Sequence, residues 1–300
     1  MPRKGARAHA AALVGLLAPG NSADVQEETA QTLSRLCAVN SRNVGYIRQA
    51  GGVAALVGLL APGGAAGVHE QAMSALDALC LGDARSQDSV LECGGIAALV
   101  GLLAPGRSAG VHKLAACALG NLCGGDNAPA RDSARECGGV AALLGLLAPG
   151  GLAPAAVREQ AARALGQLCL QYNTANKDSV GEAGGVAALV ALLAPGGSAL
   201  LYHSAAGALA NLCIQHARNQ DRAREAGGIA ALVALLAPGG AAAARHAAVV
   251  ALHNLYEGNG PNRDCIMASG GPAALAGLLA PGVPAATKHA AAATLSELGV

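Results

Sequence analysis

The chain has 300 residues, of which 53% are hydrophobic and only 13% charged, and its net charge is +1 at pH 7. A typical soluble domain has roughly 25% charged residues, so this surface is unusually poor in charge. A net charge so close to zero gives no electrostatic footprint for nucleic acid or anionic lipid, and nucleic acid is not expected as a partner. Phe and Trp are absent. The interior must therefore be built from Ala, Leu, Val and Gly, which predicts closely packed helices with small side chains.

The first twenty residues begin with a basic stretch and continue into an apolar run, which is also the layout of a secretory signal. The string AALVGLLAPG ends this run, and it recurs at Ala54–Gly63 and Ala97–Gly106, where no signal could act. We therefore interpret residues 1–7 as a short basic tail and residues 8–300 as a series of repeats. No transmembrane segment is expected, because each apolar run stops at an Ala-Pro-Gly within about a dozen residues and a helix needs ~20 to cross a bilayer.

Each repeat is predicted to contain three helices, and the second repeat shows their order. After a double glycine, apolar residues at helical spacing predict a middle helix at 53–60, which ends at an Ala-Pro-Gly. A long helix follows at about 68–80. A short polar helix at about 87–93 then leads into the next double glycine. Asn residues near the start of the short helices, such as Asn43 and Asn262, are expected to cap them.

The tripeptide AAL marks the repeat, because it recurs at intervals of 43, 43, 44, 46, 43 and 43 residues. That period lies in the ~40–47 range of armadillo and HEAT repeats and exceeds the ~34 of tetratricopeptide repeats. The sequence therefore predicts seven repeats, whose middle helices begin near residues 11, 54, 97, 141, 187, 230 and 273.

Three motifs recur in a fixed order: GG-V/I-AALVxLLAPG, a helix ending in A/T-LxxLC, and N-x-D-x-V-x-x-A/C-GG. Together they resemble the armadillo repeat of importin-alpha, beta-catenin and the plant or protist armadillo proteins, from about Ala8 to the end of the chain. HEAT repeats have two helices and lack the double glycine. The resemblance implies an all-α fold, a right-handed superhelical solenoid of about seven armadillo repeats with three helices each. Only the spacers vary, and the fourth repeat carries two additional residues at 152–156.

Both ends of the repeat series depart from the pattern. The first repeat lacks its short helix, and the last stops at Val300 with its long helix. Neither end shows the polar capping repeat that a solenoid needs to cover its terminal core. We therefore expect either that the chain is a fragment of a longer protein or that its ends are covered by end-to-end self-association.

Five of the nine cysteines occupy one equivalent position in successive repeats. Neighbouring helices lie about 8–10 Å apart, beyond the ~7 Å Cα separation that a disulfide allows. We therefore expect free thiols that are buried as small hydrophobic groups in a reducing compartment, the cytoplasm or the nucleus. No CxxC pair is present, so no structural zinc site is expected. The five are Cys37, Cys80, Cys123, Cys169 and Cys213.

No catalytic constellation stands out in the sequence. The segment His69–Met73 begins like the HExxH zinc motif but has Met in place of the second His. No P-loop and no GxSxG elbow is present. Every His lies at a position that another repeat fills with Glu, Lys or Gln, which indicates exposed positions. We therefore expect no enzyme activity, no cofactor and no metal ion.

The resemblance also implies a binding groove, because the long helices of armadillo proteins line a concave surface along which an extended peptide runs. In importin-alpha an Asn on each long helix binds the peptide backbone and a Trp four residues earlier packs on its side chains. The Asn position is occupied here by Arg35, Ala78, Asn121, Gln167, Asn211, Asn254 and Glu297.

An amide both donates and accepts hydrogen bonds, so these Asn and Gln side chains could hold a peptide backbone. The alternative is that Asn is simply tolerated near the end of a helix. The Trp position holds no aromatic residue, which predicts weak binding or anchors supplied by the partner, and disfavours importin-like recognition of nuclear localisation signals. The candidate groove residues are Lys113, Asn121, Glu159, Arg163, Gln167, His203, Asn211, His246 and Asn254.

One turn before the Trp position, the repeats carry mainly Glu in the N-terminal part and His in the C-terminal part. A row formed by His203, His246 and His289 would gain charge near pH 6 and favour an acidic segment. The alternative is that these are solvated surface residues.

Three functions remain open from the sequence. The first is a protein-interaction scaffold that binds an extended peptide segment of another protein in the groove. The second is an architectural role, in which the ends of the solenoid pair with one another. The third is the substrate-binding part of a larger enzyme, as in plant U-box ubiquitin ligases that end in armadillo repeats. No U-box lies within these residues, so the third function requires a longer parent chain.

Overall fold

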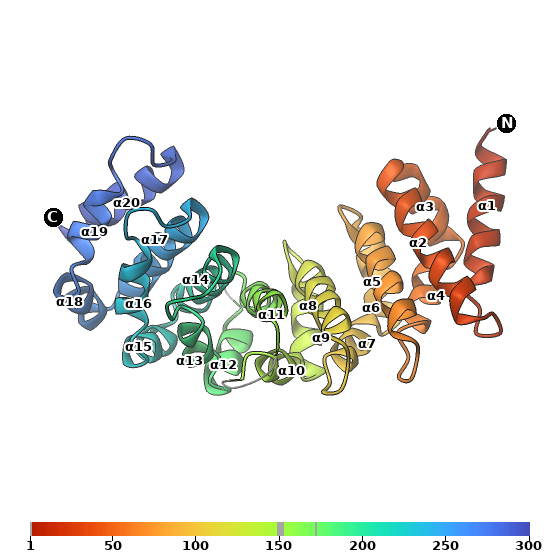
Figure 1. Cartoon of the computed structure of the whole chain (residues 1–300), viewed down its shortest axis with the longest axis horizontal. Coiled ribbons are helices and arrows are strands. Elements are labelled where there is room, and N and C mark those ends of the chain that lie inside the picture. The colour runs from red at the N-terminus through yellow and green to blue at the C-terminus, as the bar shows by residue number, and fades with distance from the viewer. Residues whose placement is uncertain (1, 149–152, 172) are drawn as a thin grey trace. The chain divides into compact units, whose positions relative to one another are not determined.

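The computed structural model describes residues 2–148, 153–171 and 173–300. These residues form twenty α-helices and contain no strand. The chain divides into two compact units, Met1–Ala142 and Leu143–Val300. The helices of both units can be followed in Figure 1, and each unit is described by itself.

The first unit begins with one continuous helix that includes most of the segment predicted as a basic tail. This helix, α1, starts at Pro2, and of the predicted tail only Met1 lies outside the described residues. The helices that follow repeat the order long, short, middle. The unit contains α1 (Pro2–Leu16), α2 (Ala23–Val39), α3 (Ser41–Gln49), α4 (Gly52–Gly58), α5 (Ala66–Cys80), α6 (Ala84–Glu92), α7 (Gly95–Leu102), α8 (Ala109–Cys123) and α9 (Ala128–Glu136), and its boundary falls within α10 (Gly139–Gly145).

The second unit repeats the same order of long, short and middle helices. The stretch 152–156, which is predicted to carry the two additional residues of the fourth repeat, begins at Leu152, and that residue lies outside the described residues. Residues 153 and 154 lead directly into α11. The unit contains α11 (Ala155–Leu168), α12 (Thr174–Glu182), α13 (Gly185–Ala191), α14 (Ala199–Cys213), α15 (Ala217–Glu225), α16 (Gly228–Leu235), α17 (Ala242–Tyr256), α18 (Gly260–Ala268), α19 (Gly271–Gly277) and α20 (Ala285–Leu298).

Three helices per repeat, as predicted, are therefore confirmed, with small shifts in the bounds. The short helix predicted at about 87–93 begins at Ala84, three residues earlier. Its first turn contains Ser86, whose hydroxyl donates to the Asp83 carboxylate at 2.6 Å. Because this turn carries polar and small residues without apolar periodicity, the sequence pattern did not mark it as helical.

The double glycine between the short and middle helices has a different role at each of its two positions. Gly51 has φ of +80°, in the left-handed region that other residues rarely adopt. Gly52 is helical, but a Cβ there would collide with the side chain and carbonyl of Ile47 at the end of α3. The first glycine therefore allows the corner, and the second allows the short helix to pack against the start of the middle helix.

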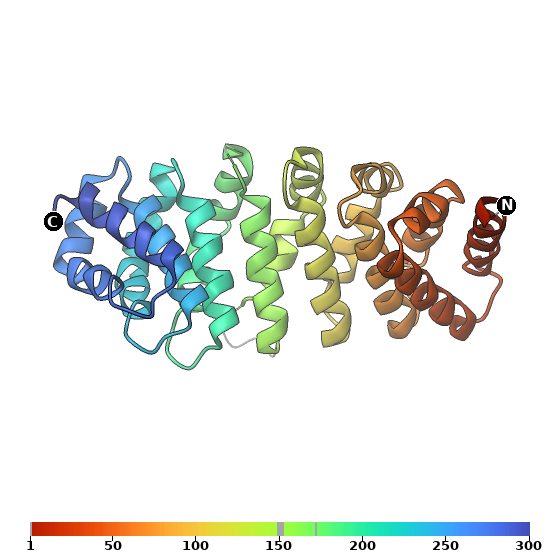
Figure 2. The ribbon, with the colours of Figure 1, turned by 90° about the horizontal axis from the view of Figure 1, so that it is seen from above.

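The long helices form the centre of each unit. Figure 2 shows them side by side, with α2, α5 and α8 in the first unit and α11, α14, α17 and α20 in the second. Buried Leu residues such as Leu119 and Leu209 fill the space between them, and buried Ala residues let the helices approach closely. The five equivalent cysteines are buried free thiols, as predicted. The core is therefore built from small and aliphatic side chains.

The Asn residues of the short helices do not cap these helices, so this prediction is wrong. Asn43 and Asn262 lie inside α3 and α18, and the capping side chain belongs to the residue before the helix, as with Asn40 and Asn259. The Asn43 amide donates instead to the Leu36 carbonyl at 2.8 Å, in the last turn of the preceding long helix. The last carbonyl groups of a helix lack partners within it, which explains why an amide from the next helix is favourable there.

Candidate functional site

The second unit contains a pocket of about 330 Å³ bordered by three successive long helices, α11, α14 and α17. Five of the nine side chains predicted from the sequence lie at its border, and small residues make up most of the rest. Residues four apart on a helix share a face, which explains why Arg163 and Gln167 both reach the pocket. The five predicted residues are Arg163, Gln167, His203, Asn211 and His246.

Two glycines shape this pocket, one by close helix packing and one by leaving open space. Gly166 of α11 lies so close to α14 that a Cβ would collide with the backbone at Ala208. Gly207, four residues before Asn211 and thus at the position that corresponds to the Trp of importin-alpha, has nothing within 4 Å of a Cβ placed on it. The long helices are therefore close together at one point and leave open space beside it.

The Asn residues at the predicted backbone-binding position each bond the preceding long helix. Asn211 Nδ2 donates to the Gly166 carbonyl at 3.0 Å, and Asn254 Nδ2 donates to the Ala210 carbonyl at 3.0 Å. Each of these bonds uses one of the two N–H groups of the amide and leaves out the Oδ1 acceptor. Asn211 lines the pocket, whereas Asn254 is buried and does not line it. The contacts give these amides a structural role, and their binding to a peptide backbone stays a prediction.

Two of the predicted residues belong to the first unit. Asn121 lies on α8, where its Nδ2 donates to the Asp77 carboxylate of α5. Lys113 is exposed about two turns earlier on the same helix. The structure therefore assigns these two residues to a different unit from the pocket.

The polar residues of α11 form a short chain along one side of the helix. Arg163 Nε donates to Gln160 Oε1 at 3.0 Å, and Gln160 Nε2 donates to Glu159 Oε1 at 3.1 Å. Arg163 is half-buried at the pocket border, and Glu159 is half-buried but does not line the pocket. The chain of bonds thus connects the predicted residue Glu159 to Arg163.

The two pocket histidines use one ring nitrogen each to contact the next long helix. His203 Nδ1 lies 3.2 Å from the Ala243 carbonyl in the first turn of α17. His246 Nδ1 lies 3.5 Å from the Thr287 hydroxyl of α20. Because a carbonyl can only accept, Nδ1 of His203 is the donor in this contact, and Nε2 is the ring nitrogen on the other side of the imidazole. The predicted gain of charge in this row stays a prediction.

Not all histidines are exposed, contrary to the sequence prediction. His69 is buried, and its Nε2 lies 3.1 Å from the Ala61 carbonyl in the loop before α5. His216 is buried at the start of α15, where its Nδ1 accepts from the Asn219 backbone N–H at 3.3 Å. Its Nε2 lies 3.2 Å from the Asp178 carboxylate. In both cases the imidazole can be buried because it bonds a nearby backbone group, the Ala61 carbonyl for His69 and the Asn219 N–H for His216.

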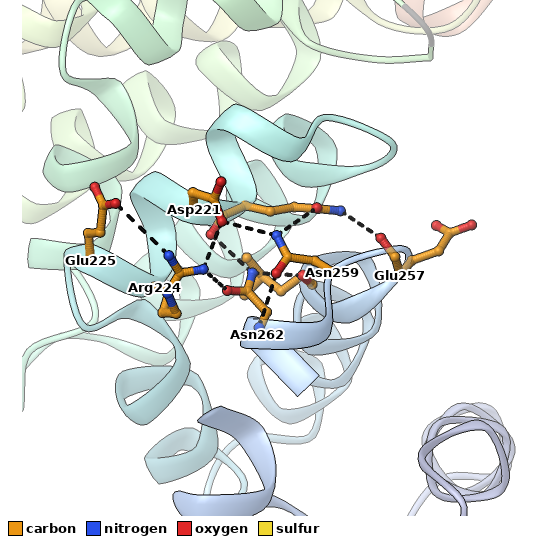
Figure 3. Close-up of polar contacts among 8 residues, drawn as sticks. Asp221, Arg224, Glu225, Glu257, Asn259 and Asn262 are labelled. Carbon is orange, nitrogen blue, oxygen red and sulfur yellow. Dashed lines mark hydrogen bonds and ion pairs between the residues drawn. The ribbon is translucent and has the colours of Figure 1, made fainter. Parts of the chain in front are cut away.

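A polar network between consecutive repeats was not predicted from the sequence (Figure 3). At the junction of α15, α17 and α18, Arg224 donates to Asp221 at 2.7 Å and to Asn262 Oδ1 at 2.8 Å. Asn259 Nδ2 also donates to Asp221, at 3.1 Å. The hydrogen bonds from Asn259 and Arg224 lower the pKa of Asp221. The recurring N-x-D motif is the signal that could have indicated this network.

In the described part of the chain, no group of three or more His, Cys, Asp or Glu side chains could hold a metal ion. Likewise, every helix within it is too short or too polar to cross a membrane.

Repeats of three helices, each packed on its neighbours, define the class of helical repeat proteins of the solenoid type. The sequence profile of the Armadillo/beta-catenin-like repeat matches residues 83–124, which span α6, α7 and α8. The same motifs recur along the rest of the chain. Residues 83–124 are therefore similar to the armadillo repeat, and the chain is a helical repeat protein of the solenoid type.

Solved structures of engineered proteins have the same fold. One engineered protein has a TM-score of 0.85 and 29% identity, over 97% of this chain and 68% of its own. A designed armadillo repeat protein has a TM-score of 0.72 and 25% identity, over 82% of this chain and 99% of its own. A second designed armadillo repeat protein, solved in complex with the peptide (KR)4, has a TM-score of 0.72 and 24% identity, over 82% and 99%. A search among curated protein sequences found no match.

Proposed function

We propose that this protein is an interaction scaffold that binds an extended peptide segment of another protein across α11, α14 and α17. The observation that carries the proposal is the pocket where side chains from these three consecutive long helices meet. Stacked repeats present equivalent side chains at regular intervals, which suits an extended chain whose residues are regularly spaced. Gln167 and Asn211 supply amides that can donate to and accept from a peptide backbone.

The designed armadillo repeat proteins that share this fold support the proposal. One of them was solved in complex with the peptide (KR)4. The present pocket contains no Trp, Tyr or Phe among its described lining residues. Because Trp and Tyr dominate binding hot spots, we expect moderate affinity and a partner that supplies its own anchors. The free thiols support the cytoplasm or the nucleus as the place of action.

Self-assembly and a role within a U-box ligase remain secondary. The first depends on how the chain ends associate, and the second on a longer parent chain. Neither has a contact in the described residues that favours it over peptide binding.

Selection from a randomised peptide display library tests the proposal. Peptides enriched on the wild-type chain are labelled, and their affinity is measured by fluorescence anisotropy for the wild type and for a Gln167→Ala/Asn211→Ala variant. Each hydrogen bond to a peptide contributes about 1 kcal/mol, so we expect the variant to bind about tenfold or more weakly.

The matched control is Glu182→Ala, an exposed position on α12 outside the pocket. It should leave the affinity unchanged. A library that yields no enriched peptide, or peptides that bind the double variant as tightly as the wild type, would exclude this surface as the binding site. Thermal melts of all three proteins check that the variants are folded.

A further inference from the structure

We propose that the α11–α14–α17 pocket selects acidic peptides, with carboxylate side chains of the partner placed between Arg163, His203 and His246. This inference rests on the proposed function and adds the class of partner to it. Its first support is the composition of the pocket. All three titratable residues that line it are bases, and none of its twelve described lining residues is acidic.

The three bases come from three consecutive long helices. Arg163 lies on α11, His203 on α14 and His246 on α17. A planar guanidinium matches the geometry of a carboxylate, and it is held at the pocket border by its bond to Gln160. His203 is fixed through Nδ1 to Ala243, which leaves Nε2 as the nitrogen for a ligand. Glu159 lies on the same helix as Arg163, but its carboxylate bonds Gln160 and does not line the pocket.

The first unit shows where a carboxylate lies in the equivalent position. Glu27 of α2 contacts the second residue of the next long helix, Gly67 of α5, so closely that a Cβ there would collide with its carboxylate. Glu70 of α5 makes the same contact with Gly110 of α8. The N-terminus of a helix carries a partial positive charge and favours an anion. In these two repeats the chain therefore supplies its own carboxylate.

In the second unit the same position holds Glu159 on α11 but a base on the next long helix, where His203 is the equivalent residue on α14. The partner of His203 in the first turn of α17 is Ala243 in place of glycine. The Cβ of Ala243 occupies space that a glycine leaves open in the first unit, so we infer that a ligand carboxylate contacts the side chains that line the pocket and not the start of α17. The N-cap of α17 is Ala241, whose side chain makes no capping hydrogen bond. The described lining of the pocket thus favours an anion and contains no carboxylate of its own.

Three labelled peptides of equal length test the inference on the full chain: acidic (DE)4, basic (KR)4 and neutral (GS)4. Anisotropy titrations at low and at high salt should show (DE)4 binding at least about tenfold more tightly than (KR)4, with the difference reduced by salt. An Arg163→Glu/His203→Glu variant should reverse this order. Because the net charge of the chain is only +1, overall charge cannot account for such a preference.

The control is Arg218→Glu, at a residue of α15 whose side chain is 74% exposed and does not line the pocket. It makes a charge change of the same sign and should leave the order unchanged. If the double variant is not folded, the milder Arg163→Gln should still reduce the preference for (DE)4. Equal binding of all three peptides, or a preference for (KR)4, would overturn the acidic selection and leave peptide binding intact. Binding of none of the three, together with an empty library selection, would overturn both.

Discussion

The two units differ in how they use one repeated position on the long helices. In the first unit Glu27 and Glu70 place their carboxylates at the start of the next long helix, against Gly67 and Gly110. In the second unit the position holds Glu159 on α11 and then His203 on α14, which contacts a carbonyl in the first turn of α17. The helices pack side by side in both cases. The stacking of the long helices therefore does not require a carboxylate at this position. The charge of the residue there can change and alter what the surface binds.

The units also differ at a buried position on the short helices. In the second unit it holds Asn176, Asn219 and Asn262, all fully buried. Asn219 Nδ2 donates to the Leu212 carbonyl of its own repeat and to the Lys177 carbonyl of the preceding one. In the first unit the same position holds Asn43, Ser86 and Ala130. Polar links between the short helices of successive repeats are therefore better developed in the second unit.

The largest expected effect comes from removing one of these buried amides. Asn219→Ala leaves the carbonyls of Lys177 and Leu212 without this donor, and we expect the free energy of unfolding to fall by about 2–3 kcal/mol. Asn43→Ala removes a single bond from a half-buried site, so about 1 kcal/mol should be lost. Urea unfolding followed by circular dichroism measures both. Equal losses in the two variants would contradict the difference between the units.

The period of the repeats and the order of the helices could be predicted from the sequence, because apolar spacing and Gly and Pro punctuation are local signals. The shared face of Arg163 and Gln167 could also be predicted, since it follows from helical geometry. The contacts between repeats could not. Arg224 and Asn262 are 38 residues apart and meet only through the stacking of α15 and α18. The burial of Asn254 likewise depends on the neighbouring helix.

A smaller effect is expected in the reactivity of equivalent thiols in the two units. Burial raises the pKa of Cys37 to about 11 and that of Cys169 to about 12. Only the thiolate reacts, and its fraction at a given pH below both values falls about tenfold for each unit of pKa. Alkylation followed by mass spectrometry near pH 8 should therefore modify Cys37 about tenfold faster than Cys169. The exposed Cys93 should react first and serves as the reference.

The outcome that would contradict this prediction is modification of Cys169 as fast as Cys37 in the folded chain. Urea at a concentration that unfolds the protein should remove the difference, because all thiols then have ordinary pKa values. The same measurement on Asn219→Ala shows whether loosening the second unit exposes its thiols.

The smallest expected effect comes from exchanging the equivalent residues Glu70 and His203 of the long helices. Glu70→His removes a carboxylate from the start of α8, along with its contact to the Ser108 hydroxyl, and should lower the free energy of unfolding by about 0.5–1 kcal/mol. The reciprocal His203→Glu places a carboxylate near the start of α17, but the Cβ of Ala243 limits its approach. We therefore expect a gain below about 0.5 kcal/mol, reduced by salt. A gain as large as the loss at Glu70 would show that the glycine at the helix start is unimportant, and adding Gly110→Ala to the wild type tests that point directly.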